Sequence, residues 1–227
     1  MNTVVNIYDP ETDTDKIDGF TIVVDVFRAF TVSYFIMENN PKKYIAVDNI
    51  DLAFKLKNEI PDSILIGERK GIKIEGFDYG NSPTEINNKD FSKNTIIHTT
   101  TAGTKGLLRQ PVKNCVVVGS FVNAKALVEY VKTNNIKVVN IFCTAEKGKK
   151  YGEEDYVFAD YLKGKILSEE VDFEEIKQKL RVGSGKVFSK NGFAPYSDFE
   201  HCMDLNKFNF IIFRKSVEND YVTLGHF

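Results

Sequence analysis

The sequence is poor in histidine and cysteine and has no long apolar run, and each shortage excludes a class of protein. Three histidines and three cysteines are widely separated among the 227 residues. This spacing supplies neither a zinc knuckle nor a disulfide framework, so we expect buried, unpaired thiols. No stretch approaches the roughly 18 apolar residues of a membrane span, and residues 1–15 lack the basic and apolar blocks of a signal peptide. We therefore expect a cytoplasmic protein with no membrane partner.

The chain also lacks a strong excess of either charge. Its 30 basic and 32 acidic residues leave a net charge of -2, which gives no reason to expect nucleic acid as a partner. Hydrophobic residues make up 42% of the chain, enough to bury a full core. We predict a single α/β domain over residues 1–227, built as one lobe or as two lobes with the site between them. The 18 phenylalanines would suit a homodimer.

Short β-branched runs alternate with amphipathic stretches along most of the chain. The predicted strands are residues 20–26, 44–48, 63–67, 94–98, 115–119 and 137–143. The predicted helices are residues 28–39, 50–59, a segment after 101, 122–134, 154–168 and 172–181. Continuous apolar strands separated by helices are typical of a layered α/β/α fold with a mainly parallel sheet. Two closing runs, residues 208–214 and 221–225, predict a C-terminal antiparallel hairpin.

Polar side chains gather where the predicted strands end. In open α/β sheets, ligands bind beyond the carboxyl ends of the strands, at the N-termini of helices. The candidates at these positions are Asp25, Arg28, Glu68, Thr100, Thr101, Gly103, Thr104, Lys105, Glu154 and Asp155. Carboxylate oxygens suit Mg²⁺, while backbone N–H groups and a guanidinium suit the oxygens of a phosphate. This edge of the sheet therefore predicts a site for a small phosphorylated anion and a magnesium ion.

Each candidate also has a structural interpretation. Asp25 could be a buried carboxylate that pairs with Arg28, and the threonines could end a strand and cap a helix. Glu154 and Asp155 could be ordinary first-turn acids, which the helix dipole favours. The basic side chains near residue 70 are typical of a solvated surface. The combination of all these residues at one sheet edge is harder to explain in this way.

Three familiar phosphate-binding motifs do not fit. The GSGKVFS segment (residues 183–189) has the wrong spacing for a P-loop. A dehalogenase-type phosphatase would carry a second acid two positions after Asp25, where Phe27 stands. A cysteine phosphatase loop would need arginine six positions after Cys143, where Lys149 stands. The common phosphate-handling folds are therefore not predicted.

Five segments in order carry a resemblance to a less common family. They are VVDVFRA (23–29), GERKG and GFDYGNSP (within 67–83), TTTAGT (99–104), GSFVNA (119–124) and EED (153–155). Together they resemble the 2-phosphosulfolactate phosphatase family over about residues 20 to 160. The resemblance implies an α/β protein unlike the usual phosphatases. It also implies Mg²⁺-dependent hydrolysis of (R)-2-phospho-3-sulfolactate to 3-sulfolactate and phosphate, a step in coenzyme M biosynthesis.

The resemblance also suggests a role for each candidate residue. Mg²⁺ would lie among Asp25, Glu68 and Glu154 or Asp155, and Asp25 would act as nucleophile or general base. Arg28 and the turn at residues 100–104 would bind the phosphoryl oxygens. The carboxylate or sulfonate of the substrate would be held by Asn81 and Ser82 with Lys105. The sequence does not separate an aspartyl-phosphate route from direct attack by water.

One departure from the family pattern leaves alternatives open. The family usually reads TTTNGT where this chain has TTTAGT, so Ala102 replaces an amide at the start of a helix. A phosphatase for another small phosphorylated hydroxy acid is one alternative. A non-catalytic anion-binding protein that kept the pocket is the other. After about residue 165 we found no clear match to the family.

Overall fold

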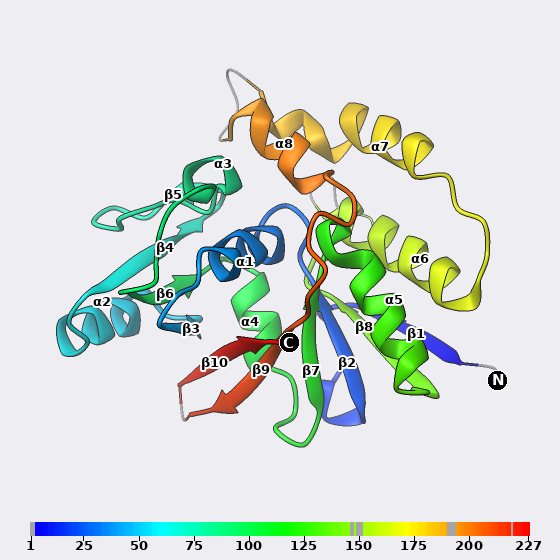
Figure 1. Ribbon diagram of the computed structural model, residues 1–227, viewed down its shortest axis with the longest axis horizontal. Coiled ribbons are helices and arrows are strands. Elements are labelled where there is room, and N and C mark those ends of the chain that lie inside the picture. Colours follow the sequence, from blue (N-terminus) through cyan, green and yellow to red (C-terminus); the bar gives the residue numbers. More distant parts are fainter. Residues whose placement is uncertain (1–2, 146–147, 149–151, 190–193, 219) are drawn as a thin grey trace.

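A computed structural model describes residues 3–145, 148, 152–189, 194–218 and 220–227 of the chain (Figure 1). Its strands form one sheet in the order β1-β8-β2-β7-β9-β10-β3-β6-β4-β5. Their bounds are β1 Val4–Tyr8, β2 Phe20–Val24, β3 Lys43–Val47, β4 Ser63–Arg69, β5 Ile72–Lys73, β6 Thr95–Thr99, β7 Cys115–Gly119, β8 Val138–Cys143, β9 Ile212–Val217 and β10 Tyr221–His226. Mixed α/β architecture with a mainly parallel sheet is therefore confirmed.

Two parallel halves meet at the C-terminal hairpin. Strands β1, β8, β2 and β7 pair in parallel on one side, and β3, β6 and β4 pair in parallel on the other. The antiparallel pair β9 and β10 joins them, because β9 pairs with β7 and β10 pairs with β3. The predicted hairpin is confirmed, but it lies in the middle of the sheet rather than at an edge. Its first strand begins at Ile212, four residues later than predicted.

Helices cover both faces of the sheet. Their bounds are α1 Ala29–Glu38, α2 Ile50–Glu59, α3 Pro83–Ile86, α4 Gly103–Leu108, α5 Ala124–Thr133, α6 Glu153–Leu167, α7 Phe173–Val182 and α8 Tyr196–Cys202. Short 3-10 turns occur at η1 Thr14–Lys16, η2 Phe121–Asn123 and η3 Ser184–Val187. The predicted helices after residues 28, 50, 101, 122, 154 and 172 are all present, within a few residues of their expected bounds.

Side chains that alternate between the two faces of the sheet explain why helices pack on both faces. On β2, Ile22 and Val24 pack with the hydrophobic cluster of α5 and α6, while Val23 packs in the cluster that contains α1. On β3, Ile45 and Val47 likewise pack against α2 and point away from that α1 cluster. Successive side chains of a strand point to opposite faces, so both faces of these strands are buried. The layer of α1 and α4 thus lies against both halves of the sheet (Figure 1).

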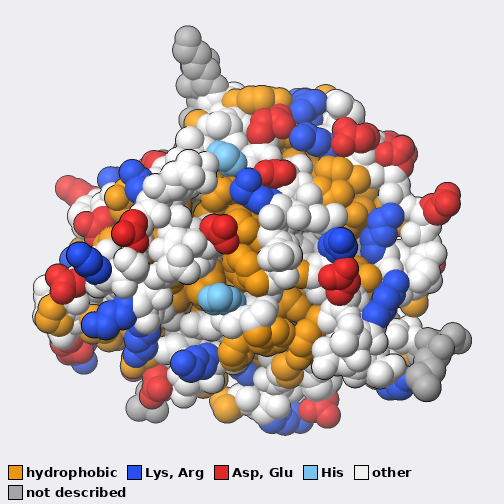
Figure 2. All heavy atoms as spheres, in the orientation of Figure 1, with side chains coloured by type: hydrophobic (Ala, Val, Ile, Leu, Met, Phe, Trp, Pro, Cys, Tyr) orange, Lys and Arg blue, Asp and Glu red, His pale blue; other side chains and the backbone are white. Residues whose placement is uncertain are grey.

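No helix in the described part of the chain is both long and apolar enough to cross a membrane. Figure 2 shows hydrophobic side chains gathered in the middle of one face and charged side chains mainly toward its rim. The homodimer suggested by the phenylalanine content stays a prediction, as does the division of the chain into one lobe or two.

Candidate active site

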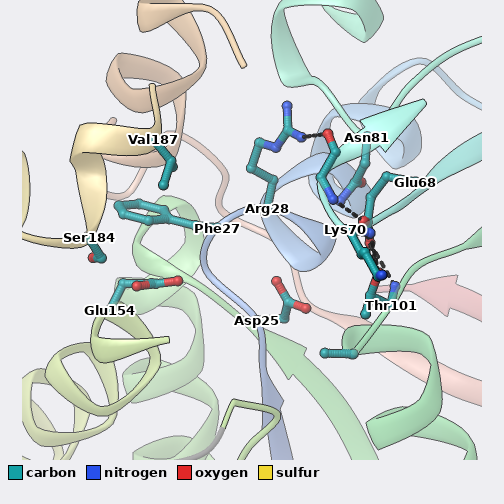
Figure 3. Close-up of a pocket in the computed structure, with 12 residues that line it drawn as sticks. Asp25, Phe27, Arg28, Glu68, Lys70, Asn81, Thr101, Glu154, Ser184 and Val187 are labelled. Carbon is teal, nitrogen blue, oxygen red and sulfur yellow. Dashed lines mark hydrogen bonds between the residues drawn. The ribbon is translucent and has the colours of Figure 1, made fainter. Parts of the chain in front are cut away.

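A cavity of about 410 Å³ opens where β2, β4 and β6 end, beside the start of α6. Both parallel halves of the sheet contribute to it (Figure 3). The residues that line it are Asp25, Phe27, Arg28, Glu68, Lys70, Gly71, Asn81, Thr101, Ala102, Glu154, Ser184 and Val187. The predicted edge of the sheet therefore does carry a pocket, and three of the four predicted carboxylates line it.

Asp25 lies directly after strand β2, and its carboxylate points into the cavity (Figure 3). Its Oδ1 accepts a hydrogen bond from the backbone N–H of Ala29, at 2.9 Å, in the first turn of α1. Its Oδ2 accepts a long one of 3.4 Å from the Thr144 hydroxyl. Burial raises the pKa of Asp25 from 3.8 to about 6, and the nearby charge of Glu68 adds to the rise. Asp25 can therefore hold a proton near neutral pH or lose it to a cation.

Glu68 is the penultimate residue of β4, and it holds part of the glycine-rich segment, residues 67–83, in place. Its Oε1 accepts the backbone N–H of Thr101 at 2.6 Å. Its Oε2 accepts the backbone N–H of Gly71 at 2.6 Å and the Thr101 hydroxyl at 2.9 Å. Gly71 has a φ of 82°, a conformation that glycine adopts without strain. The carboxylate thus ties the turn after β4 to the turn after β6.

Gly103 begins α4 and lets that helix approach Asp25 closely. A Cβ atom at this position would lie 2.8 Å from the Asp25 Oδ2 and 2.6 Å from the Ala29 Cβ. Any larger residue would force the start of α4 away from the carboxylate. Gly103 therefore shapes the floor of the cavity without lining it.

Glu154 lies on the opposite wall, in the first turn of α6, with only 6% of its surface exposed. Its Oε2 accepts one long hydrogen bond of 3.3 Å from the backbone N–H of Gly152. Burial raises its pKa from 4.5 to about 7; the Ser184 hydroxyl opposes the rise, and the charge of Asp25 adds to it. The side chains of Phe27 and Val187 make this wall apolar (Figure 3).

Asp155 follows Glu154 in sequence but does not line the cavity. Its Oδ1 accepts the backbone N–H of Val26 at 2.8 Å, and its Oδ2 accepts the Thr144 hydroxyl at 3.4 Å. Burial, together with the charges of Asp25 and Glu154, raises its pKa well above 3.8. Of the two predicted alternatives, Glu154 is the one that faces the cavity. Asp155 holds the loop after β2 in place.

Arg28 lines the cavity, and its ion pair is with a residue that the sequence did not single out. Its Nη1 lies 2.6 Å from the Oδ2 of Asp198, and both side chains are buried. Its Nη2 donates to the carbonyl oxygen of Gly71 at 3.0 Å. Asp198 stands in the first turn of α8, where an acid is usually explained by the helix dipole. Nothing in the local pattern distinguishes it from such an acid.

Asn81 and Ser82 form the other end of the glycine-rich segment. Asn81 lines the cavity, and its Oδ1 lies 3.1 Å from the Nε2 of His98. Burial lowers the pKa of His98 to about 3, and its Nδ1 lies 2.6 Å from the Tyr44 hydroxyl. Ser82 caps α3 and donates its hydroxyl to Asp198 at 2.7 Å. Asn81 therefore faces the cavity as expected, whereas Ser82 supports it from behind.

In the turn after β6, too, some of the predicted residues line the cavity and others do not. Thr101 and Ala102 line the cavity, but Thr100 and Thr104 are buried and bond to each other's backbone and hydroxyl groups. Lys105 is exposed and does not line the cavity. The structure instead brings Lys70 to the cavity wall. Lys70 was interpreted from the sequence as part of a solvated surface, since basic residues in loops usually are.

Magnesium can be tested against the donors that are present. Within the described ranges, no group of three or more histidine, cysteine, aspartate or glutamate side chains is arranged to hold a metal ion. Mg²⁺ does not require such a cage, because it often binds through one or two carboxylates and completes its shell with water and phosphate. Asp25 and Glu68 line one cavity, and the charge of Glu68 raises the cost of charging Asp25. A bound cation would remove that cost, so these two residues fit the ion.

The fold and the site define an α/β protein whose cavity lies at the carboxyl ends of parallel strands, where such sheets usually bind their ligands. Carboxylates, a guanidinium and a lysine line this cavity. The family model for 2-phosphosulpholactate phosphatase matches residues 7–216, and the chain belongs to this family. The match corrects the sequence interpretation, in which the resemblance ended before residue 165. The α7–α8 segment, Asp198 included, falls inside the family match.

Three relatives, each named a probable 2-phosphosulfolactate phosphatase, illustrate the similarity. The protein of Caldicellulosiruptor saccharolyticus is 34% identical over 158 residues, which cover 68% of this chain and 65% of that protein. The protein of Bacillus subtilis is 36% identical over 147 residues, covering 64% and 63%. The protein of Carboxydothermus hydrogenoformans is 32% identical over 215 residues, covering 88% of each chain. The first two alignments span less than two thirds of those relatives' own lengths. The name that the relatives share is that of a phosphoric monoester hydrolase.

Proposed function

We propose that the protein is a Mg²⁺-dependent phosphatase that hydrolyses (R)-2-phospho-3-sulfolactate to 3-sulfolactate and phosphate. The observation that carries this proposal is the cavity itself. Asp25, Glu68 and Glu154 line it together with Arg28 and Lys70, in a chain that belongs to the 2-phosphosulpholactate phosphatase family. Uncatalysed hydrolysis of phosphate monoesters is extremely slow, so an enzyme must neutralise much charge and fix the reacting groups. This cavity offers both.

The carboxylates at the end of β2 and β4 would hold the metal ion. Asp25 and Glu68 are the residues that fit Mg²⁺, and the ion would supply positive charge that offsets the charge developing on the phosphoryl oxygens. Arg28, which also lines the cavity, would contribute a second positive charge. Its guanidinium is held rigidly, which suits the binding of two phosphoryl oxygens at once.

Asp25 would start the reaction. It lies at the floor of the cavity, and it can act as the nucleophile or as the base that takes a proton from the attacking water. In the first route the phosphoryl group passes to the carboxylate and then to water. In the second route water attacks phosphorus directly. Both routes break the bond between phosphorus and the ester oxygen.

Glu154 would complete the reaction by protonating the leaving oxygen. The leaving group is an alkoxide, which needs a proton as the ester bond breaks. A carboxyl group with a pKa of about 7 is partly protonated at neutral pH and can donate that proton. Its apolar surroundings, with Phe27 and Val187, keep water away from the transfer. The remaining acidic groups of the substrate would lie toward Lys70 and Asn81.

The test is the release of phosphate from a panel of phosphorylated hydroxy acids, with Mg²⁺ and then with EDTA. The panel includes 2-phospho-3-sulfolactate, phospholactate and phosphoglycolate. We expect the fastest release from the sulfolactate ester and none after the metal is removed. Equal release in EDTA would contradict the metal requirement, and no release from any ester would favour an anion-binding protein.

Ala102 favours a second candidate substrate, another small phosphorylated hydroxy acid, which the same panel of esters can test. Its methyl group lines the cavity at the position where the family resemblance implies an amide. Another small phosphorylated hydroxy acid, with one acidic group fewer, would need one polar contact fewer. An Ala102→Asn variant should then move the preference toward 2-phospho-3-sulfolactate by about 10-fold. The place of the reaction in coenzyme M biosynthesis and the cytoplasmic location stay predictions.

A further inference from the structure

A buried carboxylate on helix α8 connects that helix to Arg28 in the cavity wall and to the start of α3. Asp198 has none of its surface exposed. It comes from a segment that follows Arg28 by 170 residues and Ser82 by 116 residues. No part of Asp198 lines the cavity itself. Its effect on the site must therefore pass through the residues that it contacts.

Each oxygen of Asp198 holds a different element. Oδ2 accepts from the Arg28 Nη1 at 2.6 Å, and Arg28 in turn donates to the carbonyl oxygen of Gly71 at 3.0 Å. Oδ1 accepts from the Ser82 hydroxyl at 2.7 Å and from the backbone N–H of Thr84 at 3.0 Å. Arg28 and Gly71 line the cavity, and Ser82 directly follows Asn81, which also lines it. Two of its partners thus belong to the wall of the site or adjoin it: Arg28 lines the cavity, and Ser82 follows Asn81.

Burying the ion pair between Arg28 and Asp198 costs free energy, and packing alone does not account for it. Removing two charges from water costs several kcal/mol for each ion, and an apolar pair of similar size is often more stable. A guanidinium that is held at two of its nitrogens, by Asp198 and by Gly71, is oriented before any ligand binds. Such preorganisation lowers the cost of binding an anion and of stabilising charge in a transition state.

We propose that Asp198 is a positioning residue for the phosphatase reaction, because it fixes Arg28 toward the phosphoryl group and Asn81 toward the acidic end of the substrate. The proposal rests on the function proposed above. A positioning role for Asp198 can be distinguished from a role in stability alone. Partial unfolding lowers the amount of active enzyme but leaves KM unchanged. A misplaced Arg28 instead alters the affinity for phosphate itself.

The first test compares Asp198→Asn with the matched control Glu200→Gln. Glu200 is on the same helix and pairs with Lys177 and Arg181 at 3.0 Å each, away from the cavity. For D198N we expect about 10-fold increases in KM and in the Ki of inorganic phosphate, and a fall in kcat/KM of about 100-fold. For E200Q we expect changes of less than about twofold, because these partly exposed ion pairs lie away from the cavity and contribute little.

A double-mutant cycle with Arg28→Gln tests whether Asp198 acts through Arg28. If it does, D198N should reduce kcat/KM far less in the R28Q background than in the wild-type enzyme. Fully additive losses would overturn this part of the proposal. Should D198N fail to give a cooperative melting transition, Asp198→Glu takes its place. That variant keeps the charge but moves it by one methylene, and the same increases in KM and Ki are expected.

The outcomes separate this inference from the proposed function. Unchanged KM and Ki in folded D198N or D198E, beside an active wild-type enzyme, would overturn the positioning role and leave the phosphatase function standing. If the wild-type protein released no phosphate from any ester, the function would fail. The affinity for inorganic phosphate, measured by calorimetry, would then still report on Asp198, and an unchanged affinity would overturn its positioning role independently.

Discussion

Glu68 and Glu154 lie on opposite walls of one cavity, and their surroundings differ sharply (Figure 3). Glu68 accepts three hydrogen bonds of 2.9 Å or less from Thr101 and Gly71. Among the described residues, Glu154 accepts a longer hydrogen bond of 3.3 Å from Gly152, and it lies beside Phe27 and Val187. Hydrogen bonds to a carboxylate favour its charged form, whereas an apolar surrounding favours its protonated form.

The difference assigns separate chemical tasks to two side chains of the same type. The wall around Glu68 is a fixed polar scaffold, which suits the binding of a cation and of phosphoryl oxygens. The wall around Glu154 is apolar and keeps a carboxyl group with a pKa of about 7, which suits proton transfer. Asp25 lies between them: the charge of Glu68 raises the pKa of Asp25, and the charge of Asp25 raises the pKa of Glu154.

Removing the group between the walls should have the largest effect. We expect Asp25→Asn to lower kcat by about 10³-fold or more, because both the attack on phosphorus and a metal ligand are lost. Asparagine has the same shape and can still accept the N–H of Ala29, so far-ultraviolet circular dichroism should be unchanged. Steady-state phosphate release measures the effect, and an active D25N enzyme would contradict the role of Asp25.

Removing the proton donor should have a smaller effect that depends on the leaving group. We expect Glu154→Gln to lower kcat by about 10²-fold for esters with an alkoxide leaving group. For p-nitrophenyl phosphate the loss should be much smaller, because nitrophenolate leaves without a proton. Parallel assays of the two substrates measure the contrast. Equal losses on both would mean that Glu154 acts in another way.

Disturbing the polar scaffold should change binding more than turnover. In Glu68→Gln, the amide N–H₂ group meets the N–H of Gly71 or Thr101, so at least one buried hydrogen bond is lost. We expect about a 10-fold weaker apparent affinity for Mg²⁺ and a similar rise in KM. Titration of the activity with MgCl₂ is the measurement, and the wild-type Mg²⁺ dependence would contradict this account of Glu68.

The smallest effect is on stability and follows from the raised pKa values of the facing acids. Asp25 titrates at about 6 in the folded protein instead of 3.8, and Glu154 at about 7 instead of 4.5. A group with a raised folded pKa contributes stability below its unfolded pKa and loses it as the pH rises through the folded pKa. His98, with its pKa lowered to about 3, has the opposite slope below pH 6.5. These two acids contribute less stability as the pH rises, against His98, which contributes more, so we expect a net loss of stability.

We therefore expect the metal-free protein to melt roughly 5 °C lower at pH 7.5 than at pH 5.5. The double variant Asp25→Asn, Glu154→Gln should lose most of this difference, since the two carboxyls that face the cavity are gone and their charges no longer add to the raised pKa of Asp155. Exposed Asp160→Asn, also on α6, is the matched control and should keep it. Differential scanning calorimetry at the two pH values makes the comparison. A wild-type protein that is more stable at pH 7.5 would contradict the assigned directions.

Much of the fold and part of the site could be predicted from local patterns. The buried strands and most of their helices follow from apolar periodicity, and Asp25, Glu68 and Glu154 follow from their places beyond strand ends. The central place of the β9–β10 hairpin could not be predicted, because pairing with β7 and β3 depends on contacts distant in sequence. Strand β1 was missed because the mixed residues of its sequence, VVNIY, carry a weak period.

The wall residues that were missed depend on the same long-range contacts. The role of Asp198 can be recognised only from its contact with Arg28, 170 residues away in sequence. Ser184 and Val187 reach the cavity from a short turn with no strand before it. Conversely, Thr100, Thr104 and Lys105 follow a strand in the expected way, but their side chains are buried among themselves or exposed. Position beyond a strand predicts proximity to a site, and side-chain direction then decides which residues face it.

The pH dependence of kcat/KM for the wild-type enzyme and Glu154→Gln tests the division between the two walls most directly. The account predicts that wild-type activity falls as the pH rises through about 7, where Glu154 loses its proton. In E154Q this fall should be absent and the residual activity should stay level toward pH 9. The same fall near pH 7 in both enzymes would show that another group donates the proton, and would contradict the account.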